Sequence, residues 1–363
     1  MRGNITRRGK SSWRLKFDVA STNGKRVTRF KTVRGSYKDA QKELTALLSA
    51  ADERRLPAAT SATVAEYTRA WLDGAHGLSP KTVERYRELA ERQIVPHLGE
   101  IKVQWLTDTE IEDWHGKLLK AGLSPRTVVH AHRVLAKVLA RAKNNAASAV
   151  DLPAVEDKEM AILTADQIGT VTAKLDGHTL YPIVRLALET GMRRGELLGL
   201  QWGDCDLDAG TLKVERSVEE TKAGLRIKPP KTKRGRRNIT LPAETVAMLR
   251  SYKVKAMEIR LALGMGNIAP ETWVFSTAEG ELRSPDNLSR DWRRVCRAKK
   301  LPLVRFHDLR HTHASLLIKA GVDILTISRR LGHNKPSVTL DTYGHLIEGA
   351  DAAAAEAIAG VLK

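Results

Sequence analysis

The sequence predicts a multidomain α+β protein of three parts: a small amino-terminal β-sheet with one helix, an all-helical bundle, and a mixed, mainly helical domain with a small antiparallel sheet. Three observations favour this. The chain has 363 residues, enough for two or three domains of ~100 to 150 residues each. Apolar and polar residues alternate near the amino terminus, and helical spacing follows. Both patterns occur after residue 160.

The first domain is expected to span residues 1–55 as a three-stranded sheet with a helix. Residues 12–19 alternate like a strand, Asn23-Gly24 is a strong hairpin turn, and residues 25–32 form a second candidate strand. A helix is expected over 37–51. The expected core consists of Trp13, Leu15, Phe17, Val27 and Phe30. The alternative is a disordered basic tail that adheres non-specifically to a polyanion.

Positive charge is concentrated in this first part. The chain carries 61 Lys and Arg against 42 Asp and Glu, a net charge of +19. Residues 1–38 contain 12 of the basic residues and one acid, Asp18. Such a balance favours a polyanionic partner, most simply nucleic acid, although RNA and acidic membranes would also suit it.

The second domain is expected over residues 60–152, after a polar and alanine-rich connector at 56–61. Apolar residues have helical spacing at 64–72, and Thr107 resembles the cap of a further helix. Ser79-Pro80 and Ser124-Pro125 indicate two more helix starts, because proline is tolerated in the first helical turn. With 13 basic and 11 acidic residues between 59 and 152, composition alone does not mark this bundle as a DNA-binding domain.

The third domain is expected over residues 160–363, after a linker at 151–158. An apolar helix at 183–188 leads into Gly191, and helical spacing resumes at 194–200, so Arg193 is expected near a turn between two helices. Short strands are expected at 211–217, 224–227 and 237–241. Lys231 would then lie on a mobile hairpin loop between the last two strands.

Three motifs in this domain carry phosphate chemistry. TGMRRGEL occupies residues 190–197, HDLRHTH occupies 307–313, and LGH at 331–333 precedes Tyr343 by ten residues. Arginine forks bind the free oxygens of a phosphate, histidines share or move protons, and a tyrosine oxygen can attack phosphorus. Together they predict an enzyme acting on DNA phosphates.

With these motifs the chain resembles the tyrosine recombinases of the phage-type integrase family. The resemblance includes the Pro-Lys-Thr segment at 230–232 and His345, two residues after the tyrosine. It implies that domain 1–55 binds arm-type DNA sites, that domain 60–152 is a SAM-like bundle for core sites, and that domain 160–363 is catalytic.

The resemblance also implies the role of each site residue. Tyr343 would be the nucleophile, Arg193 and Arg310 would clamp the phosphate, and Glu196 would support them. His307 and His333 would bind the phosphate, with His307 the better candidate for the tyrosine proton, and Lys231 would protonate the leaving 5′ oxygen. No cofactor, metal or ATP is expected. His311 and His313 are expected to be packing or supporting groups, because no carboxylate or cysteine completes a zinc pattern.

The implied function is integration and excision of a mobile element such as a prophage, through a 3′-phosphotyrosine intermediate and a Holliday junction. The implied partners are double-stranded DNA attachment sites, three further copies of this chain in a tetramer, and a DNA-bending host factor and excision factor. Cys205 and Cys296 lack zinc or disulfide spacing, and no apolar run approaches ~18 residues, so a cytoplasmic protein without a membrane partner is expected. A non-catalytic DNA-binding regulator, a chromosome-dimer resolvase and a type IB topoisomerase remain alternatives.

Overall fold

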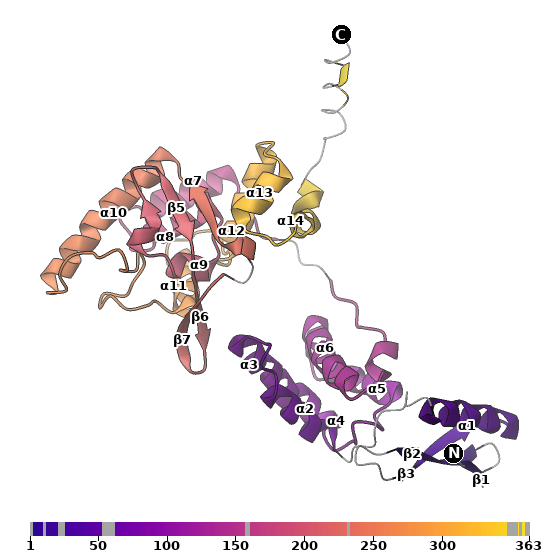
Figure 1. Ribbon diagram of the computed structural model, residues 1–363. Coiled ribbons are helices and arrows are strands. Elements are labelled where there is room, and N and C mark those ends of the chain that lie inside the picture. The colour runs from indigo at the N-terminus through magenta and orange to yellow at the C-terminus, as the bar shows by residue number, and fades with distance from the viewer. Residues whose placement is uncertain are drawn as a thin grey trace. The chain divides into compact units, whose positions relative to one another are not determined.

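The chain divides into two compact units, Met1–Asp157 and Lys158–Lys363, and each is considered by itself. The computed structural model (Figure 1) describes residues 3–9, 12–20, 26–52, 62–156, 160–230, 233–346, 355 and 358–359. The expected turn at Asn23-Gly24 and the expected catalytic Lys231 lie outside these residues. None of the described helices combines the length and the apolar character needed to cross a membrane.

The first unit begins with an antiparallel sheet in the order β1-β2-β3, followed by one helix. Its elements are β1 (Gly3–Gly9), β2 (Ser12–Ala20), β3 (Arg26–Arg34) and α1 (Tyr37–Asp52). Leu15 and Phe17 on β2 are buried against Ala40 and Leu44 of α1. The alternation of the sequence therefore arises because one face of the sheet packs on a helix.

The expected core of this sheet was wrong at one position. Phe30 is 50% exposed, and the guanidinium carbon of Arg14 lies 4.0 Å from its ring centroid. Phe30 pairs in register with the exposed Lys16, and residues opposite one another in antiparallel strands share a face. Phe30 therefore lies on the face away from α1. The side chain of Val27, also expected in the core, is outside the described residues.

Helices make up the rest of the first unit. They are α2 (Val64–Asp73), α3 (Pro80–Leu89), the π-helical turn η1 (Ala90–Ile94), α4 (Val95–Leu98), α5 (Asp108–Lys120), α6 (Pro125–Arg141) and the 3₁₀ turn η2 (Ala146–Ala149). The side chains of Ser79 and Ser124 accept hydrogen bonds from backbone N–H groups of α3 and α6, as expected for helix caps. The π-helical turn is followed by Val95 and then by Pro96, which has no N–H to donate to the α-helical ladder.

The second unit is mixed, with two small antiparallel sheets among helices, and the multidomain α+β prediction is confirmed. Up to β8, its elements are α7 (Ala165–Leu175), α8 (Tyr181–Thr190), α9 (Arg194–Leu198), η3 (Trp202–Asp204), β4 (Cys205–Asp206), β5 (Thr211–Val214), β6 (Ser217–Thr221), β7 (Gly224–Lys228), η4 (Lys233–Gly235) and β8 (Arg237–Thr240). The remainder are α10 (Ala243–Ala262), α11 (Pro285–Ala298), α12 (Asp308–Lys319), α13 (Ile324–Leu331), α14 (Pro336–Tyr343) and η5 (Gly344–Leu346).

The expected hairpin around Lys231 was wrong. β7 pairs with β6 in a two-stranded sheet that projects from the rest of the unit in Figure 1, whereas β8 pairs with β5 in the sheet β4-β5-β8. β7 and β8 therefore belong to different sheets and do not pair as a hairpin. Alternation identifies strands but not their partners, because pairing is decided by contacts distant in sequence.

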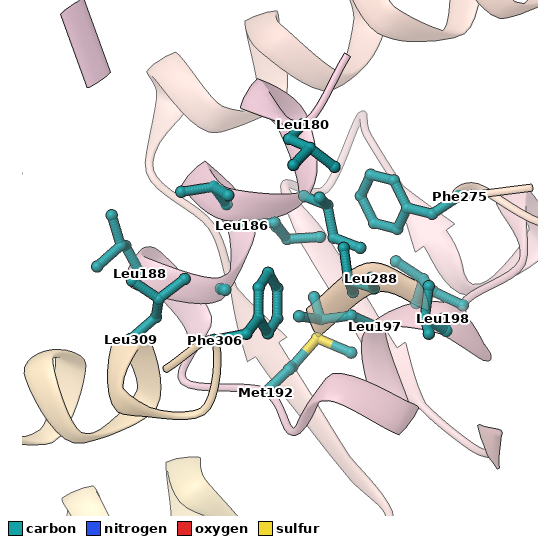
Figure 2. Close-up of a cluster of buried hydrophobic side chains, with 14 of the residues drawn as sticks. Leu180, Leu186, Leu188, Met192, Leu197, Leu198, Phe275, Leu288, Phe306 and Leu309 are labelled. Carbon is teal, nitrogen blue, oxygen red and sulfur yellow. The ribbon is translucent and has the colours of Figure 1, made fainter. Parts of the chain in front are cut away.

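The core of the second unit lies directly beside the motif residues. Figure 2 shows side chains of α8, Met192, α9, α11 and Phe306 converging, and Leu309 of α12 belongs to the same buried cluster. Met192, Leu197 and Leu309 are each at most 2% exposed. Arg193 and Arg310 each follow one of these buried residues in the chain. Close packing of the core thus limits how far the backbone at either arginine can shift.

Candidate active site

Arg193 lies at a tight turn between α8 and α9, as expected. α8 ends at Gly191, which adopts φ +62° in the left-handed region. A Cβ at this glycine would lie 2.6 Å from Cδ2 of His313 and 2.8 Å from Cδ2 of Leu331, so position 191 has neither the backbone conformation nor the space for a side chain. Arg193 then occupies the N-cap position of α9, with its side chain 38% exposed.

Glu196 joins two arginines. Its Oε1 accepts a hydrogen bond of 2.8 Å from Nη1 of Arg193, and its Oε2 accepts one of 2.9 Å from Nη2 of Arg237. Its side chain is 2% exposed. Burial alone would raise the pKa of Glu196, but the charges and hydrogen bonds of Arg237 and Arg193 bring that pKa below its usual value. Glu196 therefore stays ionised and orients both guanidiniums.

Arg310 is buried, with 3% exposure. Its Nη1 donates to the carbonyl of Gly191 at 2.6 Å, and its Nη2 donates to the carbonyl of Leu331 at 2.8 Å. Burial, followed by the positive charge of Arg193, lowers the pKa of Arg310 to about 9, although Glu196 acts in the opposite direction. A positive charge at this position is costly, so an anion bound beside it would be strongly stabilised.

Three arginines meet at the carboxyl end of α13. Arg237 Nε donates to the carbonyl of Arg330 at 2.6 Å, Arg310 to that of Leu331, and Arg193 Nη2 to that of Gly332 at 3.4 Å. The last carbonyls of a helix lack partners within it and carry partial negative charge. We call Arg193, Arg237 and Arg310 the arginine cluster. Among the described residues, the one carboxylate paired with these three positive charges is that of Glu196, so the cluster keeps a net positive charge and forms a site for an anion.

The two predicted phosphate-binding histidines belong to the same region. His307 lies at the start of α12, and part of its side chain is exposed. The surrounding protein still removes water from the ring, and this desolvation, together with the charges of His311 and Arg310, lowers its pKa to about 4. Nδ1 of His333 lies 2.7 Å from Oγ1 of the buried Thr339. Burial, followed by Arg310 and Arg193, lowers the pKa of His333 to about 4. Both rings are therefore neutral near neutral pH and can donate a hydrogen bond without carrying charge.

Tyr343 is the last residue of α14 and is 1% exposed. Its Oη lies 2.7 Å from Nδ1 of His311. Burial raises the pKa of Tyr343 to about 12, while Arg310 and Arg193 act against that rise. The phenol is thus protonated near neutral pH and lies within the field of two arginines of the cluster.

A basic pocket of about 510 Å³ opens beside His307. Its lining includes Arg194, Arg293, Arg297 and Arg305. Arg194 is held by Ser289 and by Asp286, and Arg305 is paired with Asp308. Arg293 and Arg297 lie one turn apart on α11 and are exposed. This pocket extends the positive surface away from the arginine cluster.

The structure thus brings five predicted residues together through direct contacts or electrostatic influence: Arg193, Glu196, His307, Arg310 and His333, with Tyr343 joined through His311. Lys231 lies outside the described residues, and its basic neighbour Lys228 forms an ion pair with Glu219. Among the described residues, no group of three or more His, Cys, Asp or Glu side chains could hold a metal ion.

Sequence reasoning did not single out Arg237, although its side chain is only 6% exposed and completes the cluster. In the sequence Arg237 ends a basic run at 233–237 and resembles a surface charge. Its one distinguishing signal is its position at the start of the alternating strand expected at 237–241. His311 was expected to be a supporting group, and its contact with Tyr343 depends on a neighbour 32 residues away.

Comparison with known proteins finds two family models that match this chain. Residues 154–349 match the model of the Phage integrase family, and residues 63–119 match that of the Phage integrase, N-terminal SAM-like domain. Similar proteins include the integrase of Mycobacterium phage L5, 29% identical over 320 residues that cover 86% of this chain and 83% of that protein. The ICEBs1 integrase of Bacillus subtilis is 28% identical over 275 residues, 74% of each chain.

Two solved structures share the fold. One is the Tn1549 transposon integrase in complex with transposon right end DNA, with a TM-score of 0.68, 21% identity, and coverage of 81% of this chain and 98% of that chain. The other is a lambda integrase dimer bound to a core site, with a TM-score of 0.58, 18% identity, and coverage of 95% and 94%.

Proposed function

The chain belongs to the phage integrase family, and from this we propose that it is a site-specific DNA recombinase that acts through a 3′-phosphotyrosine intermediate at Tyr343. The observation that supports this most directly is the arginine cluster. Three guanidiniums from separate segments are held at the end of α13. The charges of two of them, Arg310 and Arg193, act to lower the pKa of the Tyr343 phenol. A phosphodiester bound there would face both positive charge and a nucleophile.

The proposed reaction needs charge stabilisation and two proton transfers. Oη of Tyr343 attacks the scissile phosphorus, the bond from phosphorus to the 5′ oxygen breaks, and a 3′ phosphotyrosine remains. Arg193 and Arg310 bind the non-bridging oxygens as negative charge grows in the pentavalent transition state. His307 and His333 donate hydrogen bonds to the phosphate, and Lys231 protonates the departing 5′ oxygen. The guanidiniums supply the charge that a metal would otherwise supply, and the covalent link conserves the bond energy without ATP.

The predicted modules would divide the binding of DNA. Residues 1–55 would bind arm sites and residues 60–152 would bind core sites, the second supported by the match to the N-terminal SAM-like domain. The basic pocket beside His307 would hold DNA backbone next to the cleaved phosphate. Four copies would exchange strands through a Holliday junction to integrate or excise a mobile element, aided by a DNA-bending host factor and an excision factor.

Covalent trapping tests this proposal. Wild-type protein and Tyr343→Phe are mixed with labelled DNA from beside the gene, with EDTA and without ATP, and resolved on denaturing gels. We expect an adduct with wild type alone, and sequencing of the attached DNA would give the cleavage position. Tight binding without an adduct on any fragment would favour a non-catalytic regulator. An adduct with Tyr343→Phe would show that another side chain is the nucleophile.

A further inference from the structure

The hydroxyl of Tyr343 has a defined partner within the protein. Its Oη lies 2.7 Å from Nδ1 of His311, and the two ring centroids are 5.7 Å apart. Tyr343 is 1% exposed, so its hydroxyl has the ring of His311 as hydrogen-bond partner, whereas an exposed phenol would bond to water. Within the described residues, the hydrogen-bond partner of this oxygen is His311 and not His307.

The surroundings of His311 favour the form that can accept a proton. Burial, with the positive charges of Arg305 and Arg310, lowers its pKa, and Asp308 opposes that change. The ring of His307 packs edge-on against it at 5.2 Å between centroids, and the protonated phenol of Tyr343 faces it from α14. A neutral imidazole has one ring nitrogen with a free lone pair. With its proton on Nε2, His311 would accept the phenol O–H at Nδ1.

We propose that His311, rather than His307, is the catalytic group that receives the proton of Tyr343 during DNA cleavage; this rests on the proposed recombinase function. As the phenol oxygen forms its bond to phosphorus, the O–H bond breaks and the proton passes to Nδ1 of His311. The bond from phosphorus to the 5′ oxygen breaks, and that oxygen takes a proton from Lys231. In strand joining, an attacking 5′ hydroxyl returns its proton to Lys231, and the leaving phenolate recovers its proton from His311.

The assignment also explains why two histidines lie one helical turn apart at the start of α12. His307 is exposed beside the basic pocket and is influenced by Arg193 and Arg310, the two proposed phosphate ligands. His311 contacts the nucleophile itself. His307 is thereby free to hydrogen-bond the phosphate, while its ring edge helps to hold the His311 ring in place.

The decisive test separates the proton acceptor from the leaving-group acid. Once trapping has located the scissile phosphate, single-turnover cleavage is measured on that DNA and on the same DNA with sulfur in place of the 5′ bridging oxygen. A thiolate leaves without a proton, so Lys231→Ala should be slow on oxygen and restored on sulfur. His311→Asn should be slower than wild type by roughly 100-fold on both substrates, because general-base catalysis contributes about that much and sulfur does not replace it.

Four further measurements on two variants guard against a merely structural effect. Asparagine places an amide near the position of Nδ1 and can keep the contact with Tyr343, so His311→Asn should bind DNA and unfold thermally like wild type. The smaller variant His311→Ala should regain cleavage with added imidazole. Wild type should cleave more slowly as the pH falls and His311 becomes protonated. His311→Ala should lack this fall in the cleavage rate at low pH.

The outcomes distinguish the two levels of the proposal. No adduct from wild type in the trapping experiment overturns the recombinase function and this inference together. Full activity of His311→Asn, or its rescue by sulfur, overturns only the role of His311. If His307→Asn instead shows the sulfur-independent loss and the imidazole response, then His307 is the proton acceptor.

Discussion

At the scale of single residues, the position of each guanidinium is fixed by acceptors that belong to the fold. Arg310 uses two backbone carbonyls, and Arg193 and Arg237 share Glu196. These bonds hold the arginines before any substrate arrives, and such preorganised charge is what stabilises a transition state most effectively. The phosphate would then complete the site without having to assemble it.

Arg310→Lys should retain the charge but lose catalysis. A lysine ammonium cannot bridge the carbonyls of Gly191 and Leu331 in the plane of a guanidinium, so it would present its charge in a different place. We expect single-turnover adduct formation to fall by roughly 100- to 1000-fold. Arg250→Lys is the matched control, because Arg250 is exposed and paired with Asp208. A loss below about tenfold would mean that charge alone is sufficient.

His313 should make folding stability depend on pH. Its Nδ1–H donates to the carbonyl of Leu188 at 2.8 Å, and its Nε2 accepts from Nε of Arg330 at 3.2 Å. Burial, followed by Arg330, lowers its pKa to about 4. A depressed histidine pKa stabilises the fold fully above the unfolded value of about 6.5, and this contribution is lost as the pH falls towards 4.

The contribution of His313 is on the order of 3 kcal/mol at neutral pH. His313→Asn keeps a donor for the Leu188 carbonyl but cannot titrate. Its stability deficit against wild type should therefore shrink as the pH falls from about 7 to about 4.5, as measured by denaturant unfolding of both proteins. A deficit that stays constant across this range would show that His313 does not carry the linkage.

At the scale of elements, the turn between α8 and α9 connects the core to the site. Gly191 supplies the left-handed residue, its carbonyl binds Arg310, and Arg193 begins the next helix two residues later. His313 and Leu331 pack where a side chain at position 191 would lie. The turn therefore positions two of the three arginines in the cluster.

Gly191→Ala should impair both stability and cleavage. The substitution forces a left-handed conformation on a residue with Cβ and pushes against His313 and Leu331. Gly177→Ala is the control, since Gly177 also has positive φ, of +70°, but nothing lies within 4 Å of its added Cβ. The control should cost about 1 to 2 kcal/mol, the conformational term alone. Equal thermal shifts in the two variants would show that the packing around position 191 relaxes freely.

Local chemistry explains which elements could be predicted. Ser79, Ser124 and Thr107 cap the helices expected after them, because a cap depends on residues within three positions. The pairing of β7 with β6 and the place of Arg237 depend on contacts between distant segments. The motifs identified most of the site because their residue types are chemically distinctive, whereas Arg237 resembled any other basic residue.

At the scale of the whole molecule, each buried hydrophobic cluster of the described residues lies within one of the two units. Basic residues, in contrast, occur in every part of the chain and are densest in residues 1–38, and the net charge is +19. A molecule built in this way can bind a long polyanion through several modules, each contributing its own phosphate contacts. The three-domain division at 1–55, 60–152 and 160–363 stays a prediction, to be tested by whether each part folds alone.

The basic pocket gives the last prediction, which concerns how DNA affinity depends on salt. If Arg293 and Arg297 each neutralise a phosphate, replacing both by Gln removes two phosphate contacts and the release of counterions that each contact causes. The slope of log affinity against log salt should then become shallower by about 1.8, since each contact contributes about 0.9. Fluorescence anisotropy in the Tyr343→Phe background would measure binding without covalent trapping, and Arg250→Gln would control for loss of charge elsewhere. An unchanged slope with weaker binding would mean that these arginines shape the pocket and do not contact phosphates.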